Sequence, residues 1–295
     1  MQFNRIGIVG LGNMGLAMAI NLIKKGMNVS GFDISSAAID NAKKHHVATC
    51  KSLSELIEHA DVIILSLPKA EHVQVICLGD GGIINQKKPQ LIVIDTTTST
   101  PDVSRQIYDE FVKHDMVFVD APVSGGPKGA ITGTMSMVVG ADDDVYQTVF
   151  PLLELMSERR VHVGKVGAGN VVKIGNNLLA AAHLITTAEM VSLAYHAGVH
   201  PNKFLQGLNQ GSGRSAVSEV NFPTWVLNHA YDSGFSMGLM RKDVGLAKQM
   251  ADDLGLELPI VKNIAKIWQS SRHVLEDERD FNEMVKLTDK IFNGR

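Results

Sequence analysis

The sequence predicts an α/β fold in which a mostly parallel, doubly wound sheet is followed by an all-helical C-terminal domain. Over the first half of the chain, short apolar runs alternate with stretches of helical periodicity, which is typical of such a sheet. After Gly164 the pattern changes to a long proline-free helix over residues 165–198, and no strand is recognisable beyond Pro201. We therefore expect an α/β domain over residues 1–164 and a helical domain over residues 165–295, with the long helix joining them.

The expected strands are short apolar runs bounded by glycine or polar residues, as buried parallel strands are. They span residues 5–9, 28–32, 61–67, 91–94, 117–119 and 136–139. Helical periodicity occupies segments between them, among which are residues 13–25, 52–59 and 101–114. Gly26 after the first of these helices and Pro101 at the start of the last are the usual signals of a helix end and a helix start.

The composition is that of a soluble globular protein with room for two cores, since 45% of the 295 residues are hydrophobic and 20% are charged. The formal net charge is −3, and the lysines and arginines form no basic run, which argues against binding of nucleic acid. No apolar run approaches the roughly 20 residues that a bilayer span needs, so we expect no membrane segment.

The cysteines Cys50 and Cys77 stand in no metal-binding or redox spacing, which favours a reducing cytoplasm. The mitochondrial matrix stays open, in case a transit peptide has been removed. The histidines are scattered along the chain, and we expect no metal site.

A glycine-rich segment lies between the first expected strand and the first expected helix. It reads Gly10-Leu11-Gly12-Asn13-Met14-Gly15, the G-x-G-x-x-G pattern of Rossmann-type domains. There the first glycine permits a tight turn, the second lets the backbone approach a pyrophosphate, and the third lets helix and strand pack closely. The phosphates lie at the helix N-terminus, where free N–H groups and the helix dipole favour negative charge. The pattern alone also occurs in ordinary turns, but its place between a strand and a helix predicts a dinucleotide site.

Asp33 follows the second expected strand at about the distance from Gly15 that the pattern requires. Its carboxylate can accept both ribose hydroxyls of NAD and would repel the 2′-phosphate of NADP. The residues after it, Ile34-Ser35-Ser36, offer no arginine to neutralise that phosphate. We therefore expect NAD as the cofactor and NADP to be disfavoured; the alternative is a surface aspartate that starts a turn.

Two further segments follow strand ends, where ligands of open α/β sheets bind. Leu67-Pro68 and Asp95-Thr96-Thr97-Thr98 could contact a cofactor, or the threonines could cap the helix that starts at Pro101. The bend Ser124-Gly125-Gly126 presents consecutive backbone N–H groups that suit a carboxylate, although a plain glycine-rich loop would read the same.

Lys173 and Asn177 are four positions apart on the long expected helix and so share one face. A lysine held beside a cofactor can take up a hydroxyl proton, and an asparagine one turn away can hold that amine or a substrate carboxylate. A helical lysine is more often a solvated surface residue. The residues alone leave this choice open.

The chain resembles the β-hydroxyacid dehydrogenase family, and within it the 3-hydroxyisobutyrate dehydrogenases. The resemblance rests on separated motifs that together extend over nearly the whole chain. They are the glycine segment with Met18-Ala19-Ile20-Asn21-Leu22 behind it, Asp120-Ala121-Pro122-Val123-Ser124-Gly125-Gly126, Lys173-Ile174-Gly175-Asn176-Asn177 and Lys242-Asp243-Val244-Gly245-Leu246-Ala247. The resemblance implies that Lys173 is catalytic. The substrate's acid group would be bound by Ser124, Gly125, Gly126 and Asn177, and the cofactor would also be contacted by Leu67, Pro68, Thr98 and Lys242.

The resulting prediction is NAD-dependent oxidation of a small 3-hydroxy acid to its semialdehyde, or the reverse reduction, with Lys173 as general acid/base. The first choice of substrate is 3-hydroxyisobutyrate. Ser212-Gly213-Arg214 also resembles enzymes that act on it, but an insertion that those enzymes carry is absent around residues 230–235. The alternatives are a reductase of tartronate, succinic or another semialdehyde and a dinucleotide-binding protein without activity. An imine reductase is disfavoured, because those enzymes lack a lysine at the position of Lys173.

The helical half carries more apolar surface than one small domain can bury, and Ala180-Ala181-Ala182 would let another helix approach closely. We therefore expect a homodimer or homotetramer assembled through the C-terminal half.

Overall fold

The computed structural model describes residues 3–294 and divides the chain into two compact units, Met1–Lys173 and Ile174–Arg295. The first unit is an α/β domain and the second is helical. This confirms the predicted fold class.

The first unit is built around one nine-stranded sheet with the strand order β3-β2-β1-β4-β5-β6-β8-β7, and β9 pairs with β8. The strands are β1 (Arg5–Val9), β2 (Asn28–Phe32), β3 (Ala48–Thr49), β4 (Val62–Leu65), β5 (Ile92–Asp95), β6 (Val117–Asp120), β7 (Val123–Ser124), β8 (Met135–Gly140) and β9 (Ser157–Gly164). Pairs from β3 to β6 are parallel, whereas β8 runs antiparallel to β6 and β7. The order of strand addition reverses between β1 and β4, and sheets of this kind bind ligands at the carboxyl ends of the strands at such a point.

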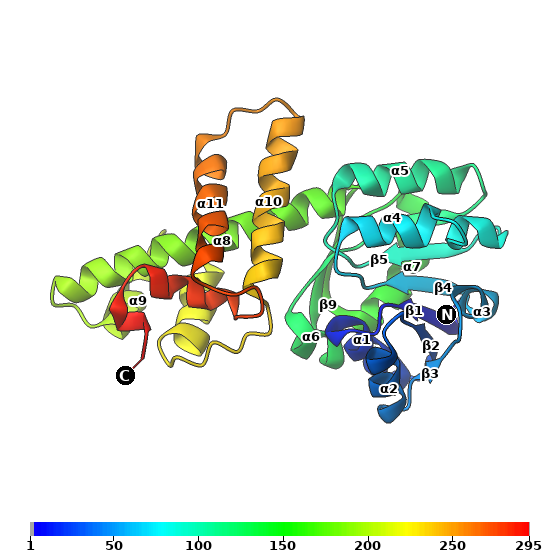
Figure 1. Cartoon of the computed structure of the whole chain (residues 1–295), viewed down its shortest axis with the longest axis horizontal. Coiled ribbons are helices and arrows are strands. Elements are labelled where there is room, and N and C mark those ends of the chain that lie inside the picture. The colour runs from blue at the N-terminus through cyan, green and yellow to red at the C-terminus, as the bar shows by residue number, and fades with distance from the viewer. Residues whose placement is uncertain (1–2, 295) are drawn as a thin grey trace. The chain divides into compact units, whose positions relative to one another are not determined.

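Helices cover both faces of this sheet (Figure 1), so nearly every side chain of the central strands is buried. One face is covered by α1 (Asn13–Lys24), α2 (Ser36–Lys44), α6 (Gly126–Thr132) and α7 (Asp143–Met156). The other face is covered by α3 (Leu53–His59), α4 (Ala70–Leu78), η1 (Ile83–Gln86) and α5 (Pro101–Val112). Alternate residues of one strand serve the two cores: Ile64 packs with the first set of helices, and Ile63 and Leu65 pack with the second.

The expected strands and helices of the first unit are present, with ends shifted by a few residues at most. Sequence analysis missed β9. This strand pairs on one side only, with β8, and Glu158 and Arg159 in it are exposed. An edge strand need not be apolar, so it lacks the run of buried residues by which the central strands are recognised.

The second unit contains helices around one core, within the residues that the structure describes. They are the greater part of α8 (Ala168–His196), then α9 (Pro201–Leu208), η2 (Val217–Val226), α10 (Met237–Asp253), α11 (Pro259–Ser270), η3 (Ser271–His273), η4 (Phe281–Leu287) and η5 (Lys290–Phe292). Trp268 is fully buried at the centre, where its indole N–H donates to the carbonyl of Ala181 at 3.3 Å. Phe222 and Phe292 pack edge to face in the same core.

The division between the units falls inside α8, after Lys173, whereas the predicted boundary lay before this helix at Gly164. The reason is a set of buried hydrogen bonds. Asn170, in the first turn of α8, bonds to Ser99, Ser104 and Asp120 of the α/β domain. Helical periodicity marks the helix but carries no sign of such contacts.

The expectation that no segment approaches the length and apolarity of a bilayer span is wrong for α8. By length and composition alone, α8 could cross a membrane, with a mean hydropathy of 1.4 in its most apolar window. Core helices of soluble proteins pass the same test, and 39% of that window is buried inside the protein. Lys173 and Asn177, both buried polar residues, also lie on this helix.

Candidate active site

The glycine segment lies at the carboxyl end of β1 and leads into α1. Gly10 has a φ of +91°, and a side chain there would bring its Cβ within 2.2 Å of the carbonyl oxygen of Ser66. A Cβ on Gly15 would come within 1.8 Å of the carbonyl oxygen of Gly10. These two glycines are therefore required by the fold itself, because neither site has room for a methyl group.

Gly12 differs, because a Cβ added there meets no atom within 4 Å. It is the N-cap residue of α1, and no side chain accepts a hydrogen bond from the first N–H groups of this helix. Open space in front of uncapped N–H groups at a helix N-terminus is what a pyrophosphate requires. The segment therefore fits a dinucleotide. Around it, Leu11 is buried, Met14 is half-buried and Asn13 is exposed.

Asp33 lies just beyond the end of β2 and is tied to the glycine segment. One carboxylate oxygen accepts the backbone N–H of Leu11 at 2.6 Å, and the other accepts that of Ser35 at 2.8 Å. Each oxygen keeps a lone pair for a further donor. The next residue, Ile34, is 91% exposed, an apolar surface that sequence analysis did not single out.

Threonine hydroxyls form hydrogen bonds that join the carboxyl ends of β4 and β5. Thr96 Oγ1 donates to the carbonyl oxygen of Leu65 at 2.6 Å, and Thr97 Oγ1 accepts the N–H of Leu67 at 3.0 Å. Thr100 caps α5 by accepting from Val103. At the same edge, Thr98 and Leu67 are half-buried and Pro68 is exposed. The proposal of cofactor contacts therefore stays with Thr98, Leu67 and Pro68, while the neighbouring threonines hold the strands.

Lys173 and Ser124 are brought together although they are 49 residues apart in the sequence. The Lys173 amine donates to the Ser124 hydroxyl at 2.9 Å, and Lys173 is only 7% exposed. The alternative of a solvated surface lysine, which the residues alone left open, is therefore excluded. Ser124 ends β7, and the next two residues, Gly125 and Gly126, have φ values of +120° and +60°. These positive φ values give a sharp turn directly after Ser124, and residues other than glycine seldom adopt them.

Asn177 and Lys242, both in the second unit, lie beside a buried carboxylate. Asn177 Nδ2 donates to Asp243 Oδ2 at 2.5 Å, and Lys242 Nζ lies 3.1 Å from Asp243 Oδ1. Asp243 is 1% exposed. Sequence analysis quoted Asp243 within a motif but gave it no role. The structure shows that it fixes the orientation of the Asn177 amide.

Asp120 and Asn170 are the other residues whose part sequence analysis missed. Both are fully buried where β6 ends and α8 begins, near Lys173 in the sequence of that helix. Burial raises the pKa of Asp120 to about 6, although N–H groups of Gly167 and Asn170 donate to it and act in the opposite direction. The available signals for Asp120 were its position at the end of an expected strand and its place at the start of a family motif.

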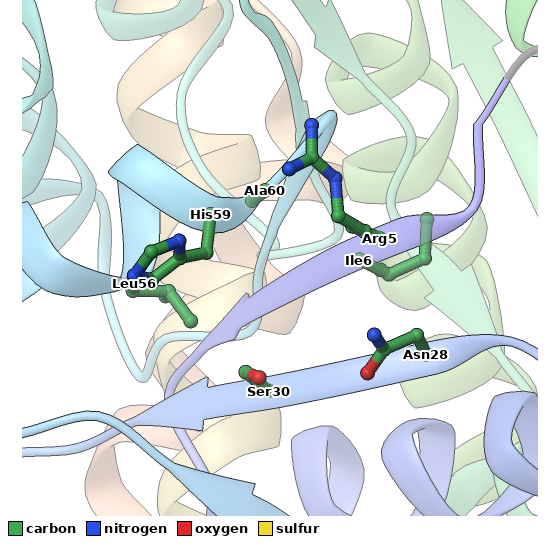
Figure 2. Close-up of a pocket in the computed structure, with 7 residues that line it drawn as sticks. All are labelled: Arg5, Ile6, Asn28, Ser30, Leu56, His59 and Ala60. Carbon is green, nitrogen blue, oxygen red and sulfur yellow. The ribbon is translucent and has the colours of Figure 1, made fainter.

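Arg214 and a metal site are the other features that sequence analysis considered. Arg214 is exposed, and within residues 3–294 no group of three or more His, Cys, Asp or Glu side chains could hold a metal ion. Figure 2 shows a hollow of about 230 Å³ at the opposite edge, where Arg5, Asn28 and Ser30 of β1 and β2 face Leu56 and His59 of α3. None of the site residues expected from the sequence lines it.

Two family descriptions match consecutive parts of the chain. Residues 5–164 match the NAD binding domain of 6-phosphogluconate dehydrogenase. Residues 167–288 match the NAD-binding domain of NADP-dependent 3-hydroxyisobutyrate dehydrogenase.

Relatives match nearly the full length. A 2-(hydroxymethyl)glutarate dehydrogenase of Eubacterium barkeri is 31% identical over 97% of this chain and 95% of its own. An NAD-dependent L-serine dehydrogenase of Pseudomonas aeruginosa is 33% identical over 97% of this chain and 98% of its own. Among solved structures, the Mycobacterium tuberculosis 3-hydroxyisobutyrate dehydrogenase with L-serine is similar with a TM-score of 0.89 and 31% identity, covering 96% of this chain and 98% of that one.

Proposed function

This chain belongs to the β-hydroxyacid dehydrogenase family, and we propose that it oxidises a small unphosphorylated 3-hydroxy acid, first of all 3-hydroxyisobutyrate, to its semialdehyde or catalyses the reverse reduction with NAD. Dehydrogenase activity on a hydroxy acid follows from the family. The substrate, the preferred cofactor and the role of each residue are the proposed part.

The observation that carries the proposal is the buried contact between the Lys173 amine and the Ser124 hydroxyl at 2.9 Å. A buried lysine beside a hydroxyl and a glycine bend provides both parts that the oxidation of a hydroxy acid needs. One is an amine that can exchange a proton with the substrate hydroxyl. The other is a set of neutral donors for the carboxylate.

In the proposed reaction, each residue has a separate role. Ser124 and the N–H groups of Gly125 and Gly126 hold the carboxylate and leave the substrate hydroxyl toward Lys173. Lys173, uncharged, accepts the hydroxyl proton as the carbonyl forms; in the reverse direction, protonated Lys173 donates to the carbonyl oxygen. The glycine segment and Asp33 would hold NAD, which when bound would supply the hydride acceptor for the carbinol carbon. Asn177, held by Asp243, is proposed as a further donor to the acid group.

The proposed substrate class is supported by the names of the relatives. They act on 2-(hydroxymethyl)glutarate, L-serine and 3-hydroxyisobutyrate. These acids share a CH2OH group on the carbon next to a carboxylate and differ in what else that carbon carries. We infer a substrate of this form for the present chain. Neutral donors at Ser124–Gly126 suit one carboxylate, whereas a phosphorylated sugar acid would call for a cluster of arginines and lysines.

The preference for NAD over NADP is supported by Asp33. Its carboxylate is fixed by two backbone N–H groups at the end of β2, where an adenosine ribose would lie. A phosphate on that ribose would face a negative charge beside the exposed apolar side chain of Ile34, which cannot neutralise it.

The experiment that tests the function is a substrate series at saturating NAD, followed by the appearance of NADH. We expect a small 3-hydroxy acid with a CH2OH group to give the highest kcat/KM. Ser124→Ala should raise KM for the best acid, because it removes a donor to the carboxylate. A higher kcat/KM for 6-phosphogluconate than for every unphosphorylated acid, or an unchanged KM in Ser124→Ala, would contradict the proposed acid site.

Assembly and location stay proposals as well. On α8, Leu179, Met190 and Leu193 are 57%, 44% and 63% exposed. With Thr186 they are spaced by seven, four and three positions, which places them on one face of the helix. We propose that a second copy of the chain covers this stripe in a homodimer or homotetramer, and that the protein works in the cytoplasm.

A further inference from the structure

A cluster of fully buried polar side chains lies where β6 ends and α8 begins. It consists of Asp120, Asn170, Ser99 and Ser104, each 0% exposed. One carboxylate oxygen of Asp120 accepts the N–H of Gly167 at 2.7 Å, and the other accepts the N–H of Asn170 at 2.8 Å. Asp120 therefore caps the start of α8 from a different element, with its negative charge at the positive end of the helix.

Asn170 extends this link to the loop after β5 and to α5. Its side-chain oxygen accepts the N–H of Ser99 at 2.8 Å, and its amide nitrogen donates to Ser104 Oγ at 3.1 Å. The end of β6, the loop after β5 and the first turn of α8 are thus joined through two side chains. Buried polar groups are expensive unless they are paired, so this set of bonds specifies one arrangement of the three segments.

The backbone packs tightly around the Asp120 carboxylate. A Cβ on Gly140 would lie 2.2 Å from Asp120 Oδ1, and a Cβ on Gly169 would lie 2.6 Å from the carbonyl oxygen of Val138. Both glycines let the chain close directly over the carboxylate. Because β8 and α8 already lie against Asp120 at these glycines, there is little room for the first turn of α8 to shift closer. We infer that the hydrogen bonds to the carboxylate set the position of this turn.

Lys173 follows Asn170 by one helical turn, and its amine reaches Ser124, which follows Asp120 on the next short strand. We propose that Asp120 and Asn170 are positioning residues: they fix the first turn of α8 and thereby the place of the Lys173 amine beside Ser124. This inference rests on the proposed function, in which Lys173 exchanges the substrate proton.

The arrangement makes activity depend on the ionisation of Asp120. Protonation turns one oxygen of the Asp120 carboxylate into a hydroxyl, which is a donor and a weaker acceptor, so its hydrogen bond from Gly167 or Asn170 weakens. Burial raises the pKa of Asp120 to about 6, against hydrogen bonds from Gly167 and Asn170 and attraction by Arg105 of α5. Asp95, its register partner on β5, and Lys173 on α8 are further ionisable groups on the elements around Asp120.

The fall of kcat at low pH should occur without a matching fall in the thermal stability of the protein. A raised pKa means that the folded protein binds this proton more tightly than the unfolded chain, so protonation of Asp120 does not favour unfolding. We therefore expect kcat to fall below about pH 6, whereas protonation of Asp120 raises the thermal midpoint over the same range rather than lowering it. If Asp120 only supported the fold, its protonation would lower kcat and the thermal midpoint together.

Asp120→Asn is the decisive variant, because it keeps the shape, removes the charge and turns one oxygen into a donor. Asp61→Asn is its matched control: that carboxylate also accepts backbone N–H groups, from Asn4 and Arg5, but it lies at the opposite edge of the sheet. We expect Asp120→Asn to lower kcat at pH 8 about 10- to 100-fold, since small misplacements of catalytic groups cost this much. KM for NAD should change less than about twofold on this reasoning, because the glycine segment is untouched. The fall of kcat near pH 6 should disappear, whereas Asp61→Asn should keep it.

Amide hydrogen exchange supplies a readout that needs no substrate. Peptides that cover residues 165–173 should exchange faster in Asp120→Asn than in the wild type and Asp61→Asn. Wild-type exchange in Asp120→Asn, or wild-type kcat with an unchanged acid limb, overturns the inference. If no hydroxy acid is oxidised by the wild type, the proposed function fails, while exchange still decides the positioning.

Should Asp120→Asn not fold, Asn170→Ser takes its place, because it retains the carboxylate and removes the bonds to Ser99 and Ser104. A lowered kcat with faster exchange at residues 165–173 supports the inference, and wild-type values of both overturn it.

Discussion

Replacing Gly12 by alanine adds one methyl group at a place where the protein has room for it. The residue has φ −67° and ψ −169°, an extended conformation that alanine adopts freely. The new Cβ would meet no atom within 4 Å. If a pyrophosphate lies in that space, the methyl group occupies part of its volume and keeps the phosphates from the N–H groups of α1.

The expected changes have opposite signs. At a compatible position, Gly→Ala stabilises a fold by about 0.4–1 kcal/mol by restricting the unfolded chain. For a protein of this size, that raises the thermal midpoint by about 1–3 °C. Affinity for NAD should fall about 10- to 100-fold, which corresponds to about 1.4–2.7 kcal/mol of lost binding free energy.

The assay is a fluorescence or calorimetric titration with NAD alongside a thermal melt of the protein without cofactor. Gly207→Ala is the matched control, since its Cβ also meets nothing within 4 Å but it lies on α9; it should keep NAD affinity. Gly15→Ala should lower both stability and affinity, because its Cβ would lie 1.8 Å from the carbonyl oxygen of Gly10. Wild-type affinity in Gly12→Ala would show that the phosphates do not lie where the open space indicates.

The remaining predictions test the other parts of the site and the fold. Lys173→Ala should lower kcat about 10²- to 10⁴-fold with NAD still bound, the usual worth of general acid–base catalysis; a near-normal kcat would assign the proton transfer elsewhere. Asp33→Ser combined with Ile34→Arg should move kcat/KM toward NADP, and a wild type that already prefers NADP would refute this account of Asp33. Asp61 has a pKa of about 2, lowered from 3.8 first by its hydrogen bond from Arg5, so it stabilises the fold above pH 3.8 and this contribution disappears as the pH falls through 2. Asp61→Asn should therefore lower the thermal midpoint at pH 7 more than at pH 2. Light scattering at micromolar concentration should give a dimer or tetramer, and a monomer mass would reject the proposed assembly.

Local physics made much of the first unit visible in the sequence. A central parallel strand is buried on both faces, so its apolar run is continuous, and the bounds expected for residues 5–9 and 28–32 agree with β1 and β2. The glycine segment was equally legible, because the steric demands at Gly10 and Gly15 act between neighbours in the chain. Asp33 follows a strand end at a fixed distance, so its place at the edge could be predicted too.

Properties that depend on distant segments were not predictable from the residues. A helical lysine has the same local sequence whether it faces water or a hydroxyl, and only the fold brings Lys173 to Ser124. The family resemblance implied a catalytic role for Lys173 but not the contact. The sequence left open whether the threonines contact a cofactor or cap α5. Thr100 is the cap, and the hydroxyls of Thr96 and Thr97 bond instead to Leu65 and Leu67.

The sequence by itself determined the order and type of the elements, because periodicity, capping and turn residues act over a few positions of the chain. Only the tertiary structure decided that Asp120 and Asn170 tie the start of α8 to the sheet, and so where the first unit ends. Their bonds join residues 50 positions apart. Such bonds form because burial of a polar group demands a partner, and which partner is available depends on the packing of the whole unit.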